Sequence, residues 1–158
     1  MKKAIVVMIL ATACSRTPDA PTTPRQTAVP KDASSLANID AFVATHLVLD
    51  LTADFAAKTL SGSAELSFDR RDPNASELVL DTRDLTIEKV EAAIGSGLWM
   101  ATTHRVDAAT PAFGSALRIA MPAGADRVRV TYSTSPMARG LQWLAPSQTA
   151  GKKHPFLF

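Results

Sequence analysis

The sequence predicts an all-β domain, folded as an antiparallel sandwich or a curved open sheet. Apolar and polar residues alternate with a period of two in several short segments, which is the pattern of half-buried strands. Glycine, proline and aspartate separate these segments at close spacing, and no convincing long helix is present. The length of 158 residues fits one folded domain of this class.

The clearest alternation is in residues 45–51, where three leucines share one face: Leu47, Leu49 and Leu51. This pattern predicts a half-buried strand, in which one of the two faces is buried. Residues 63–68 repeat the pattern, which predicts a hairpin. The connection contains residue types that are common in turns: Lys58, Ser61 and Gly62.

Four further strands are expected at residues 77–82, 84–90, 117–121 and 127–133, because each is short, leucine-rich or β-branched, and bounded by polar residues. Residues 95–114 are the least regular part. We expect the large side chains there to pack over the sheet as loop anchors, namely Trp99, Met100 and Phe113.

The amino-terminal residues have the features of a secretory signal. Lys2 and Lys3 precede an apolar run that is too short to cross a bilayer as a helix, and small residues then lead to Cys14. Residues 11–14 resemble a bacterial lipobox, with Ala11 where leucine is usual. We therefore predict a lipoprotein signal peptide at residues 1–13.

Cys14 is the predicted lipidation site, which places the chain in the cell envelope as a membrane-anchored lipoprotein facing the periplasm or the outer membrane. The alternative is an ordinary signal peptide, with Cys14 left as a free thiol. In either case the single cysteine of the sequence excludes an intramolecular disulfide.

Residues 14–38 are rich in Pro, Thr, Ala and Ser and have almost no large apolar side chains, which predicts an extended tether before a β-domain at residues 39–158. Without Lys2 and Lys3, the 17 basic residues become 15 and equal the 15 acidic ones. With no block of like charge, the chain has no electrostatic signature of a nucleic-acid partner.

No cluster of residues with a catalytic or metal-binding pattern is found. The histidines are far apart in sequence: His46, His104 and His154. None has a second histidine at the spacing that puts two ligands on one helix face, so no catalytic, cofactor-binding or metal residue is assigned. His46 is expected to face solvent or a cross-strand neighbour on a strand, and the other two to lie in loops. Asp81 and Asp84 are expected to serve a chain reversal.

The carboxy-terminal residues are apolar, in the triplet Phe156-Leu157-Phe158. An unpaired apolar strand is an aggregation liability that proteins usually cover or charge. We therefore expect further chain, or a partner, to cover it.

Four stretches of the sequence resemble the leukotriene A4 hydrolase branch of the M1 zinc aminopeptidases. They are THLVLDL at residues 45–51, KTLSGSA at residues 58–64, LVLDTRDLTIEKV at residues 78–90, and residues 134–158, which contain LQWL and end in GKKHPFLF. The resemblance implies an amino-terminal β-domain that packs against a thermolysin-like catalytic domain of the same parent protein.

The catalytic motifs of that family are absent from this sequence. Its members bind zinc through a His-Glu-x-x-His helix and a later glutamate, and none of these occurs here, so zinc is implied only for the full-length family member. The resemblance implies an inactive fragment, the product of a real truncation or of an incomplete gene model. A freestanding lipoprotein β-module that binds a protein partner is the alternative.

Overall fold

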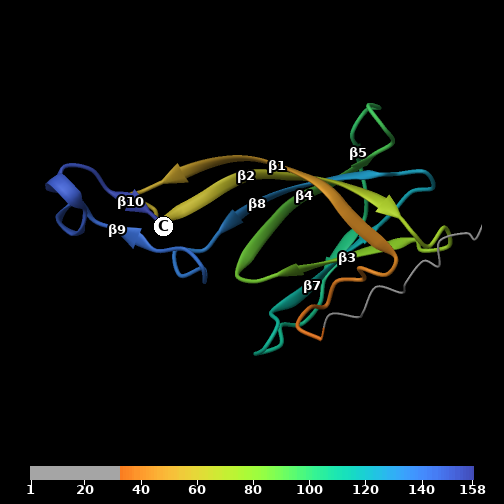
Figure 1. Ribbon diagram of the computed structural model, residues 1–158, viewed down its shortest axis with the longest axis horizontal. Coiled ribbons are helices and arrows are strands. Elements are labelled where there is room, and N and C mark those ends of the chain that lie inside the picture. The colour runs from red at the N-terminus through yellow and green to blue at the C-terminus, as the bar shows by residue number, and fades with distance from the viewer. Residues whose placement is uncertain (1–32) are drawn as a thin grey trace, which may run out of the picture.

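The computed structural model describes residues 33–158 (Figure 1). The predicted signal peptide, Cys14 and most of the predicted tether lie outside the described residues. The strands are β1 Phe42–Asp54, β2 Thr59–Arg70, β3 Glu77–Thr82, β4 Leu85–Ala93, β5 Met100–Ala101, β6 His104–Val106, β7 Ser115–Ala120, β8 Arg127–Thr134, β9 Trp143–Leu144 and β10 Phe156–Leu157. Two 3₁₀ turns, η1 Pro146–Gln148 and η2 Ala150–Lys152, separate β9 from β10.

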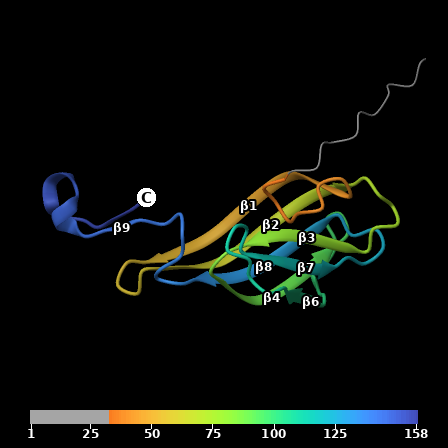
Figure 2. The ribbon, with the colours of Figure 1, turned by 90° about the horizontal axis from the view of Figure 1, so that it is seen from below.

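All strand pairs are antiparallel, and the strands form two packed sheets and one projecting hairpin. A five-stranded sheet has the order β1-β2-β8-β4-β5, and a three-stranded sheet has the order β3-β7-β6. Figures 1 and 2 show that the larger sheet is strongly curved and that the hairpin of β9 and β10 extends from one end of the molecule. The all-β prediction is confirmed, with features of both a sandwich and a curved sheet.

The hydrophobic core lies between the two sheets. Leu117 and Ile119 of β7 pack in one cluster with Val128 and Val130 of β8. Ile119 and Val128 are fully buried. These residues alternate with polar ones along their strands, which is why the period-two pattern located all four. Burial of this kind stabilises the domain by about 25 cal/mol per Å² of apolar surface removed from water.

A bulge in β1 keeps its apolar residues on one face. The pairing with β2 shifts by one residue between Ala44 and His46, so that Ala44 lies opposite Phe68 and Leu47 lies opposite Leu66. Without the extra residue, Leu47 would point to the other face of the sheet, because side chains alternate along a strand.

The β1–β2 hairpin is confirmed, but its turn is shorter than the sequence indicated. Asp54 Oδ1 accepts hydrogen bonds from the backbone N–H groups of Ala56 and Ala57, and Lys58 has a φ of 56°. Ser61 and Gly62 are not in the turn; both lie within β2. Gly62 is needed there because its backbone approaches the carbonyl of Asp50 closely.

The expected burial of the leucine face of β1 is wrong for Leu47 and Leu49, which are each 54% exposed. Alternation predicted which side chains share a face, but not whether a second layer covers that face. β1 is the edge strand of the larger sheet, and of its residues only Phe42 belongs to the core cluster.

The irregular segment contains the short strands β5 and β6, and His104 lies in β6 instead of in a loop. Trp99 packs as expected, over the guanidinium groups of Arg127 and Arg129 at 4.8 Å and 4.2 Å. The expectation is wrong for Met100 and Phe113, which are exposed. Met100 lies in the outermost strand of the sheet, where it is 55% exposed.

Candidate interaction surfaces

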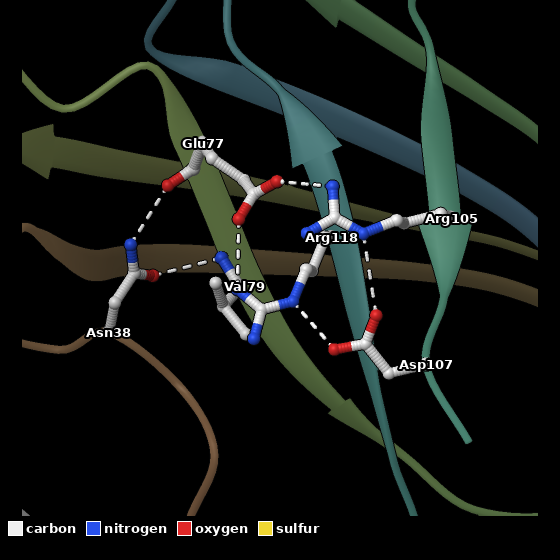
Figure 3. Close-up of polar contacts among 6 residues, drawn as sticks. All are labelled: Asn38, Glu77, Val79, Arg105, Asp107 and Arg118. Carbon is white, nitrogen blue, oxygen red and sulfur yellow. Dashed lines mark hydrogen bonds and ion pairs between the residues drawn. The ribbon is translucent and has the colours of Figure 1, made fainter. Parts of the chain in front are cut away.

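The segment before β1 is bonded to β3. Asn38 donates through Nδ2 to the Glu77 carbonyl and accepts from the Val79 N–H, both at 2.8 Å (Figure 3). Asp81 accepts bonds from the Ser35 hydroxyl and the Leu36 N–H. The expected chain-reversal role is wrong for Asp81, because this residue lies within β3 and its carboxylate anchors the segment before β1. Asp84, with a φ of 57°, does lie at the reversal between β3 and β4.

Four charged side chains on β3, β6, β7 and the residue after β6 form a closed ion-pair network on the outer face of the smaller sheet (Figure 3). Arg118 donates from Nε to Asp107 at 2.6 Å and from a terminal nitrogen to Glu77 at 2.9 Å. Arg105 contacts the second oxygens of Glu77 and Asp107, at 2.9 Å and 3.4 Å.

The hydrogen bond from Arg118 is the main cause that lowers the pKa of Asp107. The same bond is the main cause that raises the pKa of Arg118. Both oxygens of each carboxylate are engaged by a guanidinium, so neither acid is poised as a general base or acid. The network joins the three strands of the smaller sheet.

A polar groove of about 680 Å³ crosses the larger sheet, on the face that points away from the hydrophobic core. Its charged groups are mostly paired: Arg129 with Glu65 at 2.6 Å, and Lys89 with Glu91 at 2.8 Å. Asp50 lines the same groove, and no ion pair to it is found among residues 33–158. Paired charges on a solvated sheet face are the ordinary structural arrangement.

The histidines do not converge. His46 is exposed on β1, His104 is exposed on β6, and His154 is exposed after η2. Within residues 33–158 no group of three or more His, Cys, Asp or Glu side chains could hold a metal ion. The zinc that the resemblance implies for the full-length family member therefore has no candidate site among residues 33–158.

Exposed apolar side chains are the main unexplained feature of the surface. On β1 they include Val48, 46% exposed, between Leu47 and Leu49. Phe55, directly after β1, packs edge-on against Trp143 at 5.4 Å between ring centroids. In the β9–β10 hairpin, Phe156 and Phe158 are 53% and 78% exposed. Exposed apolar patches commonly mark protein contacts.

The terminal triplet is not an unpaired strand, contrary to expectation. Phe156 and Leu157 pair with Leu144 and Trp143 in the β9–β10 hairpin. Gln142 and Phe158 also exchange two backbone hydrogen bonds, of 2.7 Å and 2.9 Å. The aromatic side chains of the triplet remain exposed although its backbone is paired.

The chain is similar in sequence and in structure to known proteins. Leukotriene A-4 hydrolase of Xenopus laevis is 37% identical over 134 residues, covering 80% of this chain. Leucine aminopeptidase 2 of Neurospora crassa is 34% identical over 134 residues, covering 81% of this chain. A solved structure of yeast LTA4 hydrolase in complex with bestatin superposes with a TM-score of 0.70 at 26% identity, covering 87% of this chain.

The chain is homologous to the amino-terminal β-domain of the M1-family leukotriene A4 hydrolases. It spans about a fifth of the length of these relatives: 21% of the Xenopus protein, 19% of the Neurospora protein and 21% of the yeast chain. No family model matches the chain. No helix within residues 33–158 is long and apolar enough to cross a membrane.

Sequence reasoning found this aminopeptidase-family domain from its four stretches, but it missed the ion-pair network and the exposure of β1. The network is absent from any local motif, because Glu77 and Arg118 lie in separate strands of the smaller sheet and Asp107 follows a third. Its only signal in the sequence was a charged residue within each strand of the smaller sheet.

Proposed function

We propose that this chain is the non-catalytic amino-terminal β-domain of a zinc metalloaminopeptidase that removes amino-terminal residues from peptides. The observation that carries the proposal is the alignment of four-fifths of the chain with proteins named leucine aminopeptidase 2 and leukotriene A-4 hydrolase. The chain acts as scaffold, and its partner is the catalytic domain of the same parent protein.

The aromatic side chains around the β9–β10 hairpin support a docking role in this proposal. Phe55, Phe156 and Phe158 expose aromatic surface at the end of the molecule that carries the hairpin. A catalytic domain that buried this end would remove that surface from water, which is the main favourable term in most protein association. Zinc, in this proposal, is held by residues of the catalytic domain.

The anchoring part of the proposal rests on the sequence alone. A lipid on Cys14 would hold the parent protein at a membrane of the cell envelope, and the residues rich in proline and threonine after it would act as a spacer. Stable attachment through such a lipid requires two or more acyl chains.

The proposal predicts that the purified chain has no peptidase activity of its own. Assayed with chromogenic aminoacyl anilides, with and without added zinc, it should release product at the rate of the buffer control, because no group of zinc ligands converges in the described residues. A His46→Ala and His104→Ala double variant should give the same background. Saturable turnover that a chelator abolishes and zinc restores would contradict the proposal.

A further inference from the structure

The outer edge of β3 is covered by residues 35–38, which belong to no strand. β3 stands at one end of the strand order in the smaller sheet, and among residues 33–158 β7 is the only strand that pairs with it. Residues 35–38 run beside its other edge and are each half-buried. An edge strand otherwise presents unpaired N–H and C=O groups, which are a template for pairing with another chain.

The side chain of Asn38 makes the bonds that a neighbouring strand would make. In a parallel pair of strands, the peptide groups of one strand bond to the two residues that flank the residue opposite. The carboxamide of Asn38 does the same on either side of Leu78, because it donates to the Glu77 carbonyl and accepts from the Val79 N–H, both at 2.8 Å (Figure 3). A carboxamide has the donor and the acceptor of a peptide group, so asparagine suits this position.

Two further contacts fix the segment in place. Farther along β3, the carboxylate of Asp81 accepts hydrogen bonds from the Ser35 hydroxyl at 2.5 Å and from the Leu36 N–H at 2.8 Å. The backbone carbonyl of Asn38 accepts from the N–H of Phe42, the first residue of β1, at 3.1 Å. Asn38 therefore links the edge of the smaller sheet to the strand that begins the larger sheet.

We propose that residues 35–38 act as a surrogate strand that seals the outer edge of β3 against pairing with other chains, and that Asn38 is its positioning residue. The edge needs such protection because Leu78, Val79 and Leu80 form an apolar run, which favours strand addition when an edge is open. All the contacts lie within the described residues. The inference is independent of the proposed scaffold function, because it needs neither a catalytic domain nor a membrane.

The test is amide hydrogen exchange, measured by NMR on the full chain carrying Cys14→Ser. In Asn38→Ala we expect the N–H of Val79 to exchange at least about tenfold faster, because it loses its acceptor. The N–H of Leu80 should keep its wild-type rate, since backbone groups of successive residues point to opposite sides of a strand and this one points to β7. Analytical ultracentrifugation should show that Asn38→Ala associates with itself at lower concentrations than the wild type does.

Asn38→Asp separates the two bonds. Its side chain keeps an acceptor for the Val79 N–H, but at neutral pH it sets a carboxylate oxygen against the Glu77 carbonyl, and we expect fast exchange at Val79. Below about pH 4 the protonated carboxyl can donate to that carbonyl, which should restore the protection of Val79. A carboxylate held against a carbonyl is favoured in its protonated form, so this rescue follows the sign of the interaction.

Asn74→Ala is the matched control, because Asn74 is an exposed asparagine in the connection between β2 and β3. It should exchange and associate as the wild type does. Compared with the wild type at the same pH, an equal rise in exchange at Leu80 and Val79 in Asn38→Ala would overturn the proposal, because Asn38 would then stabilise the whole domain. So would a freed Val79 amide without increased association, or the same changes in Asn74→Ala.

Discussion

Replacing Gly62 by alanine is expected to destabilise the domain by about 3 kcal/mol, lowering the melting temperature by about 10 °C. A Cβ at position 62 would lie 2.0 Å from the backbone carbonyl oxygen of Asp50, and Gly62 has a φ of 146°. That atom belongs to the paired backbone of β1, so neither side can move without breaking the hairpin ladder. The strain and the clash therefore add.

The matched control is Gly151→Ala. Gly151 also has a positive φ, of 74°, but nothing lies within 4 Å of its Cβ position. Only the conformational strain of about 1 kcal/mol should appear there. Thermal unfolding followed by circular dichroism measures both variants. Equal melting temperatures for the two would show that the close approach in the hairpin is not a constraint.

Ile119→Ala is expected to have the other large effect, a loss of about 2 to 5 kcal/mol in the free energy of unfolding. Ile119 has 0% exposure and belongs to the core cluster between the two sheets. Its removal leaves a cavity that the paired strands β3 and β6, on either side of β7, prevent from collapsing.

Val106→Ala is the control for this substitution. Val106 lies on β6, which pairs with β7, but its side chain is 48% exposed. Chemical denaturation should give a change within about 0.5 kcal/mol for Val106→Ala. A comparable loss in both variants would mean that the cluster around Ile119 is not the core of the domain.

The sequence predicted strands such as β2 and β8 because apolar and polar residues alternate along them. Residues 77–82 and 127–133 were located to within one residue of β3 and β8. Burial was predicted less well, since Leu47 and Ile119 occupy similar patterns, yet one is exposed and the other buried. Which strand becomes an edge depends on the order of strands in the sheet, and alternation alone carries no information on that order.

The candidate surfaces depend on contacts that are distant in sequence. Arg118 meets Glu77, 41 residues earlier, and Trp143 meets Phe55, 88 residues earlier in the sequence. Such pairs could not be assigned from spacing. The family assignment did not need them, because it followed from stretches that are continuous in the chain, such as residues 78–90.

The measurement that tests the central claim most directly is the intact mass of the native product from the membrane fraction, detected with antibodies against Gln142–Lys153. Because this chain matches 21% of the Xenopus relative, the account predicts a mass about five times that of the chain, plus acyl groups. A product with the mass of this chain alone would contradict its role as the scaffold of a larger aminopeptidase.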